Sequence, residues 1–295
     1  MNRTAEHAST CRRTKIQRIN RAIFYAIALS TIYSLLPADI VIASNPTRYR
    51  PGLRNSPDQK RLDAKQLEII VRSLREKTGF AELDFDEDGF LTLGDRTNFS
   101  GGSASARELL IATMEMKHAI DLESCPRSLS ISFARIANQI TYESRATGAR
   151  IETCSIQIDF SDFSLLRGDK QALAAFDPGF VILHELGHAV LGLHDSFDNS
   201  PGDCEEMVNR IRRELNLPER QTYIAQVYSA ITTPASFRTK RAELIFKKTV
   251  VNQPNGPVFR LDWDAQRVGP ILEQTLTSGT KQQGAKPIAA TILGQ

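Results

Sequence analysis

Several features that mark specialised protein classes are scarce in this chain of 295 residues. It contains one tryptophan, four cysteines and five histidines, and it has no internal repeat and no low-complexity tract. Its hydrophobic fraction of 41% and its charged fraction of 24% are ordinary for a soluble globular protein. At this length the chain can bury a sizeable core, as one large domain or two small ones.

An excess of basic residues is also missing from most of the chain. The formal net charge is +3, but residues 1–43 carry six basic and two acidic side chains. Residues 44–295 therefore have a net charge of −1. This balance gives no indication of a nucleic-acid partner.

The N-terminal segment has the order of features typical of an export signal. A basic stretch ends at Arg21, an apolar run covers residues 22–36, and small residues near Ala43 offer a cleavage site. We therefore expect residues 1–43 to be an export signal or a membrane anchor of a secreted or periplasmic protein. A buried N-terminal helix is the alternative.

We expect contact with a membrane only through this N-terminal segment, and only if it is not cleaved. Residues 22–43 could nearly span a bilayer, but Pro37 and Asp39 disfavour a span.

The cysteines leave two interpretations open. Cys11 lies in the N-terminal segment, so three others remain, at positions 125, 154 and 204. In an oxidising compartment Cys125 and Cys154 would be the first choice for a disulfide, because they would link two stretches rich in predicted strands. Alternatively, all three are small buried residues.

The rest of the chain divides into a linker, a domain and a tail. Residues 44–61 are rich in proline, asparagine, serine and arginine, which predicts a linker. A single domain is expected over residues 62–276, and the polar residues 277–295 are expected to form a poorly ordered tail.

Periodicity predicts both helices and strands in the domain. Apolar spacing predicts helices over 62–77 and within 101–120, while alternation predicts strands over 128–136 and 153–160. Residues 238–263 predict two more strands joined by an Asn-Gly turn.

The acidic segment 80–93 (FAELDFDEDGFLTL) has two interpretations. Its acidic residues and Gly89 fall at the ligand and turn positions of a calcium loop that would end at Asp95. Alternation of Leu83 with Phe85 and of Leu91 with Leu93 instead predicts a hairpin. Gly79 interrupts the helix that an EF-hand requires, so we favour the hairpin.

The clearest motif is HELGH at residues 184–188, on a helix predicted from the cap Asp177 to the stop Gly192. Histidines four residues apart lie on one face of a helix, where His184 and His188 could bind one zinc ion. Glu185 could then accept a proton from the zinc-bound water that attacks a peptide carbonyl. Three of the five histidines fall within 184–194, which argues against coincidence.

The motif leaves one protein ligand to be found among nearby residues. His194 falls ten residues after His184, where metzincins place their third histidine, but Leu191 replaces the glycine of that motif. Asp195 lies three residues past the turning Gly192. Adjacent residues in an extended segment point to opposite sides, so only one of this pair should face the metal. The further candidates are Glu205, Glu206 and Tyr223.

These motifs resemble the zincin effector proteases that pathogenic bacteria secrete through type III systems. The resemblance rests on HELGHAVLGLHD (184–195), EEMVNRIRRELNLPERQTY (205–223) and, more weakly, GGSASAREL (101–109). Proteins of that family are zinc endopeptidases that cut host signalling proteins. The chain departs from the family at its N-terminus, since those effectors carry no export leader of this kind.

The resemblance implies roles for individual residues. His184 and His188 would bind zinc, Glu185 would be the general base, and Asp195 would be the third ligand. Tyr223 would lie close to the metal and stabilise the oxyanion.

A structural role is expected for the remaining polar residues of the second motif. Glu205 and Arg213 would form a pair behind the site.

The fold predicted is α+β and zincin-like: a small mixed sheet packed on the HExxH helix, with a second helical layer. Residues 155–160 are our candidate for the sheet edge that pairs with a substrate. The predicted function is that of a zinc-dependent endopeptidase. It would act as a monomer on protein or peptide substrates, and a secreted virulence effector is one form that it could take. The alternative is a non-catalytic metal-binding or calcium-binding surface protein.

Overall fold

The computed structural model describes residues 50–143, 150–196, 200–232, 237–250 and 256–269. The predicted leader (1–43), the predicted tail (277–295) and Cys11 lie outside these residues. Within the described part of the chain, helices are too short or too polar to cross a bilayer.

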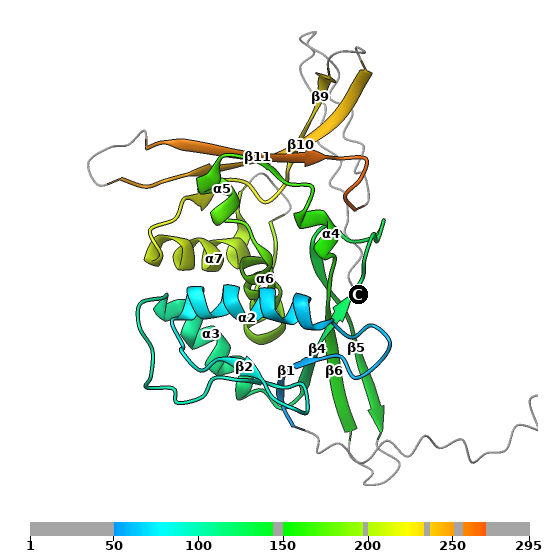
Figure 1. Cartoon of the computed structure of the whole chain (residues 1–295), viewed down its shortest axis with the longest axis vertical. Helices are drawn as coiled ribbons and strands as arrows, with labels where there is room; N and C mark the ends of the chain where they lie inside the picture. Colours follow the sequence, from blue (N-terminus) through cyan, green and yellow to red (C-terminus); the bar gives the residue numbers. More distant parts are fainter. Residues whose placement is uncertain (1–49, 144–149, 197–199, 233–236, 251–255, 270–295) are drawn as a thin grey trace, which may run out of the picture. The chain divides into compact units, whose positions relative to one another are not determined.

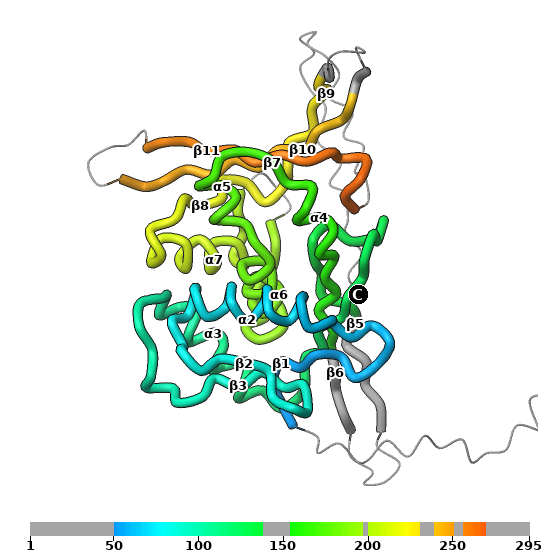
Figure 2. The backbone as a smooth tube through the Cα atoms, viewed as in Figure 1, coloured from blue at the N-terminus to red at the C-terminus, as the bar shows by residue number. Residues whose placement is uncertain are grey.

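The first sheet has four strands and is mixed, as the sequence predicted. Its order is β1 (Gly52–Asn55), β4 (Ala119–Ser124), β6 (Arg150–Ile158) and β5 (Ala134–Glu143). Strand β4 runs parallel to both β1 and β6, whereas β5 pairs with β6 in the antiparallel sense. Figure 2 shows β5 and β6 running side by side along one flank.

Two expectations about this sheet need correction. Residues 52–55, within the stretch expected to be a linker, form β1, and Leu53 is fully buried. A strand this short, with one apolar residue inward, has too weak an alternation to be distinguished from a linker. Residues 155–158 belong to β6, which is paired on both sides, so the edge strands in the described part of this sheet are β5, next to β6, and β1 at the other edge.

Four helices pack against the sheet and one another: α2 (Ala64–Thr78), α3 (Ala104–Met114), α6 (Pro178–Leu191) and α7 (Gly202–Glu214). In Figure 1, α2, α3 and α7 surround α6, which is central. One apolar core joins these helices to β1, β4 and β6. The mixed α and β composition confirms the predicted α+β class.

A second sheet caps the N-terminal half of α6. Its main path is β7 (Arg167–Gly168), β11 (Val258–Asp264), β10 (Phe237–Lys247) and β8 (Glu219–Arg220), and β9 (Gln226–Thr232) also pairs with β10. Strands β10 and β11 are the antiparallel pair predicted within 238–263, although Asn255 of the turn lies outside the described residues. The sheet packs on α5 (Lys170–Ala174) and on Val181 of α6. A short helix, α4 (Phe160–Phe163), follows β6.

The acidic segment forms the predicted hairpin rather than a calcium loop. Strands β2 (Asp84–Phe85) and β3 (Leu91–Thr92) pair antiparallel, and Gly89 adopts a φ of 81° in the turn. The Asp84 and Asp86 carboxylates form ion pairs with Arg75 and Arg50.

Candidate metal centre

Helix α6 places the HELGH motif where the sequence predicted it. The Asp177 side chain accepts from Phe180 N at 3.0 Å and caps the helix, and Gly192 ends it in the left-handed conformation, with a φ of 64°. The buried Lys77 of α2 forms an ion pair with Asp177 at 2.7 Å, which fixes the start of α6 against α2.

The two imidazoles of α6 direct one nitrogen each to a common point. Their Nε2 atoms lie 3.2 Å apart. Nδ1 of His188 lies 2.7 Å from the carbonyl oxygen of Leu193, which can only accept, so Nδ1 carries the proton. Nδ1 of His184 lies 3.3 Å from Oε2 of Glu205, without the alignment of a hydrogen bond. Each ring therefore has an acceptor at Nδ1 and leaves Nε2 available for a metal.

Asp195 supplies a third oxygen at the same point. Beyond Gly192 the chain turns back, and Asp195 pairs with Gly202 in an isolated bridge. Its Oδ1 lies 3.0 Å from Nε2 of His184 and 3.3 Å from Nε2 of His188. Among the described residues, this buried oxygen has no hydrogen-bond partner. By contrast, the side chain of His194 is exposed.

Charge coupling between these groups is strong. Burial lowers the pKa of His188, but the Asp195 carboxylate and the Cys204 sulfur together outweigh burial and raise that pKa to about 10. Burial also opposes ionisation of Asp195, yet the two imidazoles hold its pKa well below the usual range. The Asp195 carboxylate therefore stays ionised, and its negative charge favours the binding of a cation at this point.

The thiol of Cys204 completes a group of four side chains that could hold a metal ion. His184, His188, Asp195 and Cys204 have ligand atoms that all lie within 4.8 Å of one another, and the described residues contain no other such group. Cys204 is fully buried on α7, and its thiol donates to the carbonyl oxygen of His184 at 3.0 Å. Nothing in the sequence indicated a metal role for Cys204, because this residue follows the motif by 16 positions and lies on another helix.

Glu185 lies beside the metal group and contacts the sheet edge. Its buried carboxylate oxygen Oε2 accepts from the backbone N of Ile136 in β5 at 2.9 Å. Burial raises the pKa of Glu185, while the imidazoles of His184 and His188 lower it. Successive residues of an antiparallel strand present their N–H groups to alternate sides. The outer edge of β5 therefore faces Glu185.

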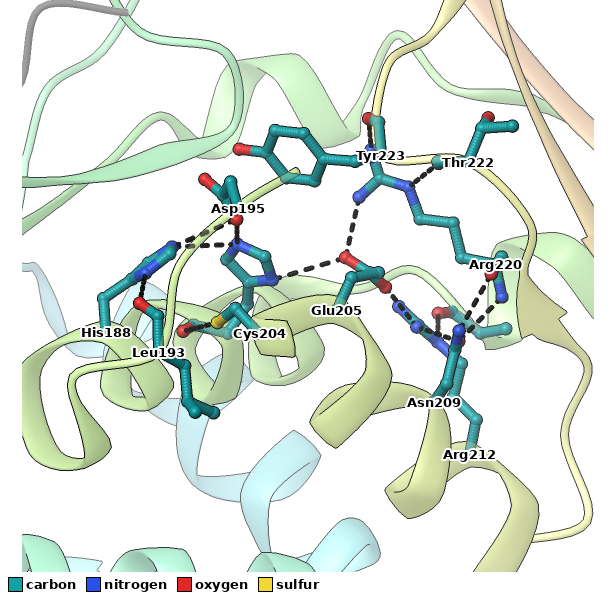
Figure 3. Close-up of polar contacts among 12 residues, drawn as sticks. His188, Leu193, Asp195, Cys204, Glu205, Asn209, Arg212, Arg220, Thr222 and Tyr223 are labelled. Carbon is teal, nitrogen blue, oxygen red and sulfur yellow. Dashed lines mark hydrogen bonds and ion pairs between the residues drawn. The ribbon is translucent and has the colours of Figure 1, made fainter. Parts of the chain in front are cut away.

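Tyr223 is also brought to the group. Its ring stacks on the His184 imidazole, with 5.7 Å between ring centroids and 10° between planes. Burial and the adjacent Asp195 carboxylate raise the pKa of its hydroxyl, which stays protonated. In Figure 3 the Tyr223 hydroxyl end lies next to Asp195.

Glu205 does not form the expected pair with Arg213. Glu205 forms ion pairs with Arg212 and, at 3.0 Å, with Arg220, whereas Arg213 pairs with Glu206 and Glu219. Burial raises the pKa of Glu205, but Arg212, Arg220 and the His184 imidazole together lower that pKa by more, which keeps the carboxylate ionised. Arg212 is seven residues after Glu205, two helical turns along the same face, so the spacing could have identified it.

The cysteines do not pair as first expected. Cys125, Cys154 and Cys204 are all free thiols, and the last two are buried. Burial raises the pKa of Cys154 to about 11, which is typical of an inert core thiol.

No family model matches the chain, and no curated protein or solved structure matches it either.

Proposed function

We propose that this chain is a zinc-dependent endopeptidase with a zincin-like fold. The single observation that carries the proposal is the triangle of Nε2 of His184, Nε2 of His188 and Oδ1 of Asp195, with edges of 3.0, 3.2 and 3.3 Å. Zinc binds nitrogen and oxygen at about 2.0–2.2 Å with tetrahedral geometry, which separates neighbouring ligand atoms by about 3.3–3.5 Å.

The donor set favours zinc over calcium or magnesium. Two imidazole nitrogens and one carboxylate suit zinc, whereas calcium and magnesium prefer oxygen ligands. The carboxylate and carbonyl at the two Nδ1 atoms are the acceptors that commonly orient zinc-binding histidines. The unpartnered Asp195 oxygen gains a partner when a cation binds.

The residues around the triangle have positions that suit peptide hydrolysis. Bound zinc lowers the pKa of a coordinated water to about 7 and polarises a carbonyl. Glu185 accepts the water proton and delivers it to the leaving amine. The protonated Tyr223 hydroxyl donates to the developing oxyanion. An extended substrate can pair with the outer edge of β5, which Glu185 already contacts.

A comparison of the full chain with its Glu185→Gln variant tests the proposal. Both proteins are loaded with zinc and incubated with a cell extract, and new protein N-termini are identified by mass spectrometry. We expect new N-termini only with the wild type, lost on adding a zinc chelator and restored by zinc. Identical N-termini from the wild type and from Glu185→Gln would contradict the proposal and would favour a non-catalytic metal-binding protein.

A further inference from the structure

Arg220, in β8, uses all three guanidinium nitrogens. Nε donates to the carbonyl oxygen of Thr222 at 2.9 Å, and Nη2 donates to the carbonyl oxygen of Tyr223. Nη1 donates to Oε2 of Glu205 at 3.0 Å. Figure 3 shows that these contacts join one side chain to two segments, the one that carries Glu205 and the one that carries Thr222 and Tyr223. The rigid planar fork of arginine fixes the relative positions of its acceptors, which a lysine ammonium does not.

The first of those segments lies behind the metal ligand His184. Glu205 is almost completely buried, and its Oε2 atom lies between Nη1 of Arg220 and Nδ1 of His184. Its other oxygen accepts from Arg212. Arg220 therefore helps to hold the carboxylate against the imidazole.

The second segment carries Tyr223. Besides the hydrogen bond to its backbone carbonyl, Tyr223 contacts Arg220 through its ring. The ring centroid lies 5.2 Å from the Arg220 guanidinium carbon, at cation–π distance. The same ring also stacks on the imidazole of His184. Arg220 thus contacts both the backbone and the ring of the residue whose hydroxyl lies beside Asp195.

The backbone of Arg220 is itself fixed to α7. The side chain of Asn209 donates to the carbonyl oxygen of Arg220 and accepts from its N–H, both at 2.8 Å. The same Asn209 oxygen accepts from Arg212. Since α7 also carries Glu205, the guanidinium starts from a fixed point relative to both segments.

From these contacts we propose that Arg220 is a positioning residue that sets the placement of Tyr223 relative to the Glu205–His184 pair. Its kinetic consequence rests on the proposed peptidase function, because Tyr223 acts there on the oxyanion. Its structural consequence, the placement of the Tyr223 ring, does not depend on catalysis.

The test uses the full chain labelled with 3-fluorotyrosine, in the wild type and in Arg220→Lys. The ¹⁹F resonance of Tyr223 is assigned by its loss in Tyr223→Phe. In metal-free protein we expect Arg220→Lys to shift or broaden this resonance. Arg213→Lys is the matched control: Arg213 is exposed, pairs with Glu206 and Glu219, and should leave the resonance unchanged. If Arg220→Lys does not fold, as judged by circular dichroism, Arg220→Gln takes its place.

Two further measurements separate positioning from general support. Zinc affinity by chelator competition should weaken about 10–100-fold in Glu205→Gln, the size of effect expected for a residue behind a ligand, and less in Arg220→Lys. In peptidase assays, kcat should fall in Arg220→Lys with little change in KM. Arg220→Lys should then lower kcat little further in a Tyr223→Phe background, by less than about 3-fold, because the two residues act as a unit.

The outcomes are distinguishable. An unchanged Tyr223 resonance in Arg220→Lys would overturn the inference, and so would losses of kcat that multiply fully in the double variant. If the wild type cleaves nothing, the proposed peptidase function fails, while the resonance of the metal-free protein still decides the role of Arg220.

Discussion

Oδ1 of Asp195 lies 3.0 Å from Nε2 of His184, while the preceding side chain, His194, is exposed. The two residues that competed for the third ligand position in the sequence thus lie in different environments. The backbone explains the difference, because Asp195 pairs with Gly202 and the carbonyl of His194 accepts from Cys204 N at 3.2 Å.

The first prediction follows from this relationship. Asp195→Ala removes a ligand, so we expect its zinc affinity to fall by well over 10-fold, since even residues behind the ligands are worth 10–100-fold. His194→Ala is the matched neighbour and should bind zinc like the wild type. Isothermal titration with zinc measures both. Zinc loss in His194→Ala with retention in Asp195→Ala would instead indicate a metzincin-like site.

The second prediction concerns Gly187, inside the HELGH motif. A Cβ added there would lie 2.7 Å from Cε of Met207 and 2.9 Å from Sγ of Cys204, so α6 and α7 approach closely at this glycine. Alanine favours a helix by about 1 kcal/mol over glycine, but overpacking costs about 1–3 kcal/mol. We expect Gly187→Ala to lower the free energy of unfolding by about 1 kcal/mol, measured by urea denaturation.

The control for Gly187 is Gly192, where an added Cβ meets nothing within 4 Å but the φ is 64°. Gly192→Ala should also destabilise the protein, through backbone strain of about 1–2 kcal/mol. Adding Met207→Ala should reduce the cost of Gly187→Ala and leave that of Gly192→Ala unchanged. Equal responses of the two variants would show that helix packing is not the cause.

The third prediction concerns Glu214, at the end of α7. Its carboxylate accepts from the hydroxyls of Ser103 and Ser105, both at 2.6 Å, and from Ser105 N at 3.1 Å, at the N-terminus of α3. We expect Glu214→Ala to lower the free energy of unfolding by about 1–2 kcal/mol, because a negative charge stabilises a helix N-terminus and charged hydrogen bonds are lost.

Glu206→Ala is the comparison variant for Glu214, because it removes an exposed ion pair with Arg213 on the same helix. Such surface pairs contribute about 0–1 kcal/mol. Thermal or urea unfolding of the two variants should rank Glu214→Ala as clearly the less stable. The reverse order would contradict the capping role.

The fourth prediction concerns pH and Asp162, in α4. Burial raises the pKa of this carboxyl to about 6, although the N–H of Phe133 donates to it and lowers the pKa. The folded protein therefore binds this proton more tightly than the unfolded chain does. The resulting stability is complete below about pH 4 and is lost as the pH rises through about 6.

Asp162→Asn keeps an acceptor for Phe133 and removes the titration. Between pH 4.5 and pH 7 the wild type should lose stability relative to Asp162→Asn, by at most about 3 kcal/mol for a shift of about two pKa units. Urea unfolding of both proteins across this range measures the difference, in which the other carboxylates cancel. Parallel curves would show that folding does not raise the pKa of Asp162.

The sequence predicted the helices near the metal group because their signals are local. Asp177 and Gly192 mark the ends of α6, and the spacing of His184 and His188 places both on one face of any helix. The hairpin at Gly89 and the pair β10–β11 were also readable, from alternation and turn residues. Short elements with weak alternation, such as β1, were not.

The tertiary structure alone decided which strand reaches Glu185, that Arg220 also holds Glu205, and that Cys204 joins the metal group. Those contacts link residues on different elements, and periodicity reports only which face of one element is buried. The choice between His194 and Asp195 lies between the two cases. Alternation along an extended chain predicted that one of them faces the metal, but only the pairing of Asp195 with Gly202 set which side of the segment turns inward.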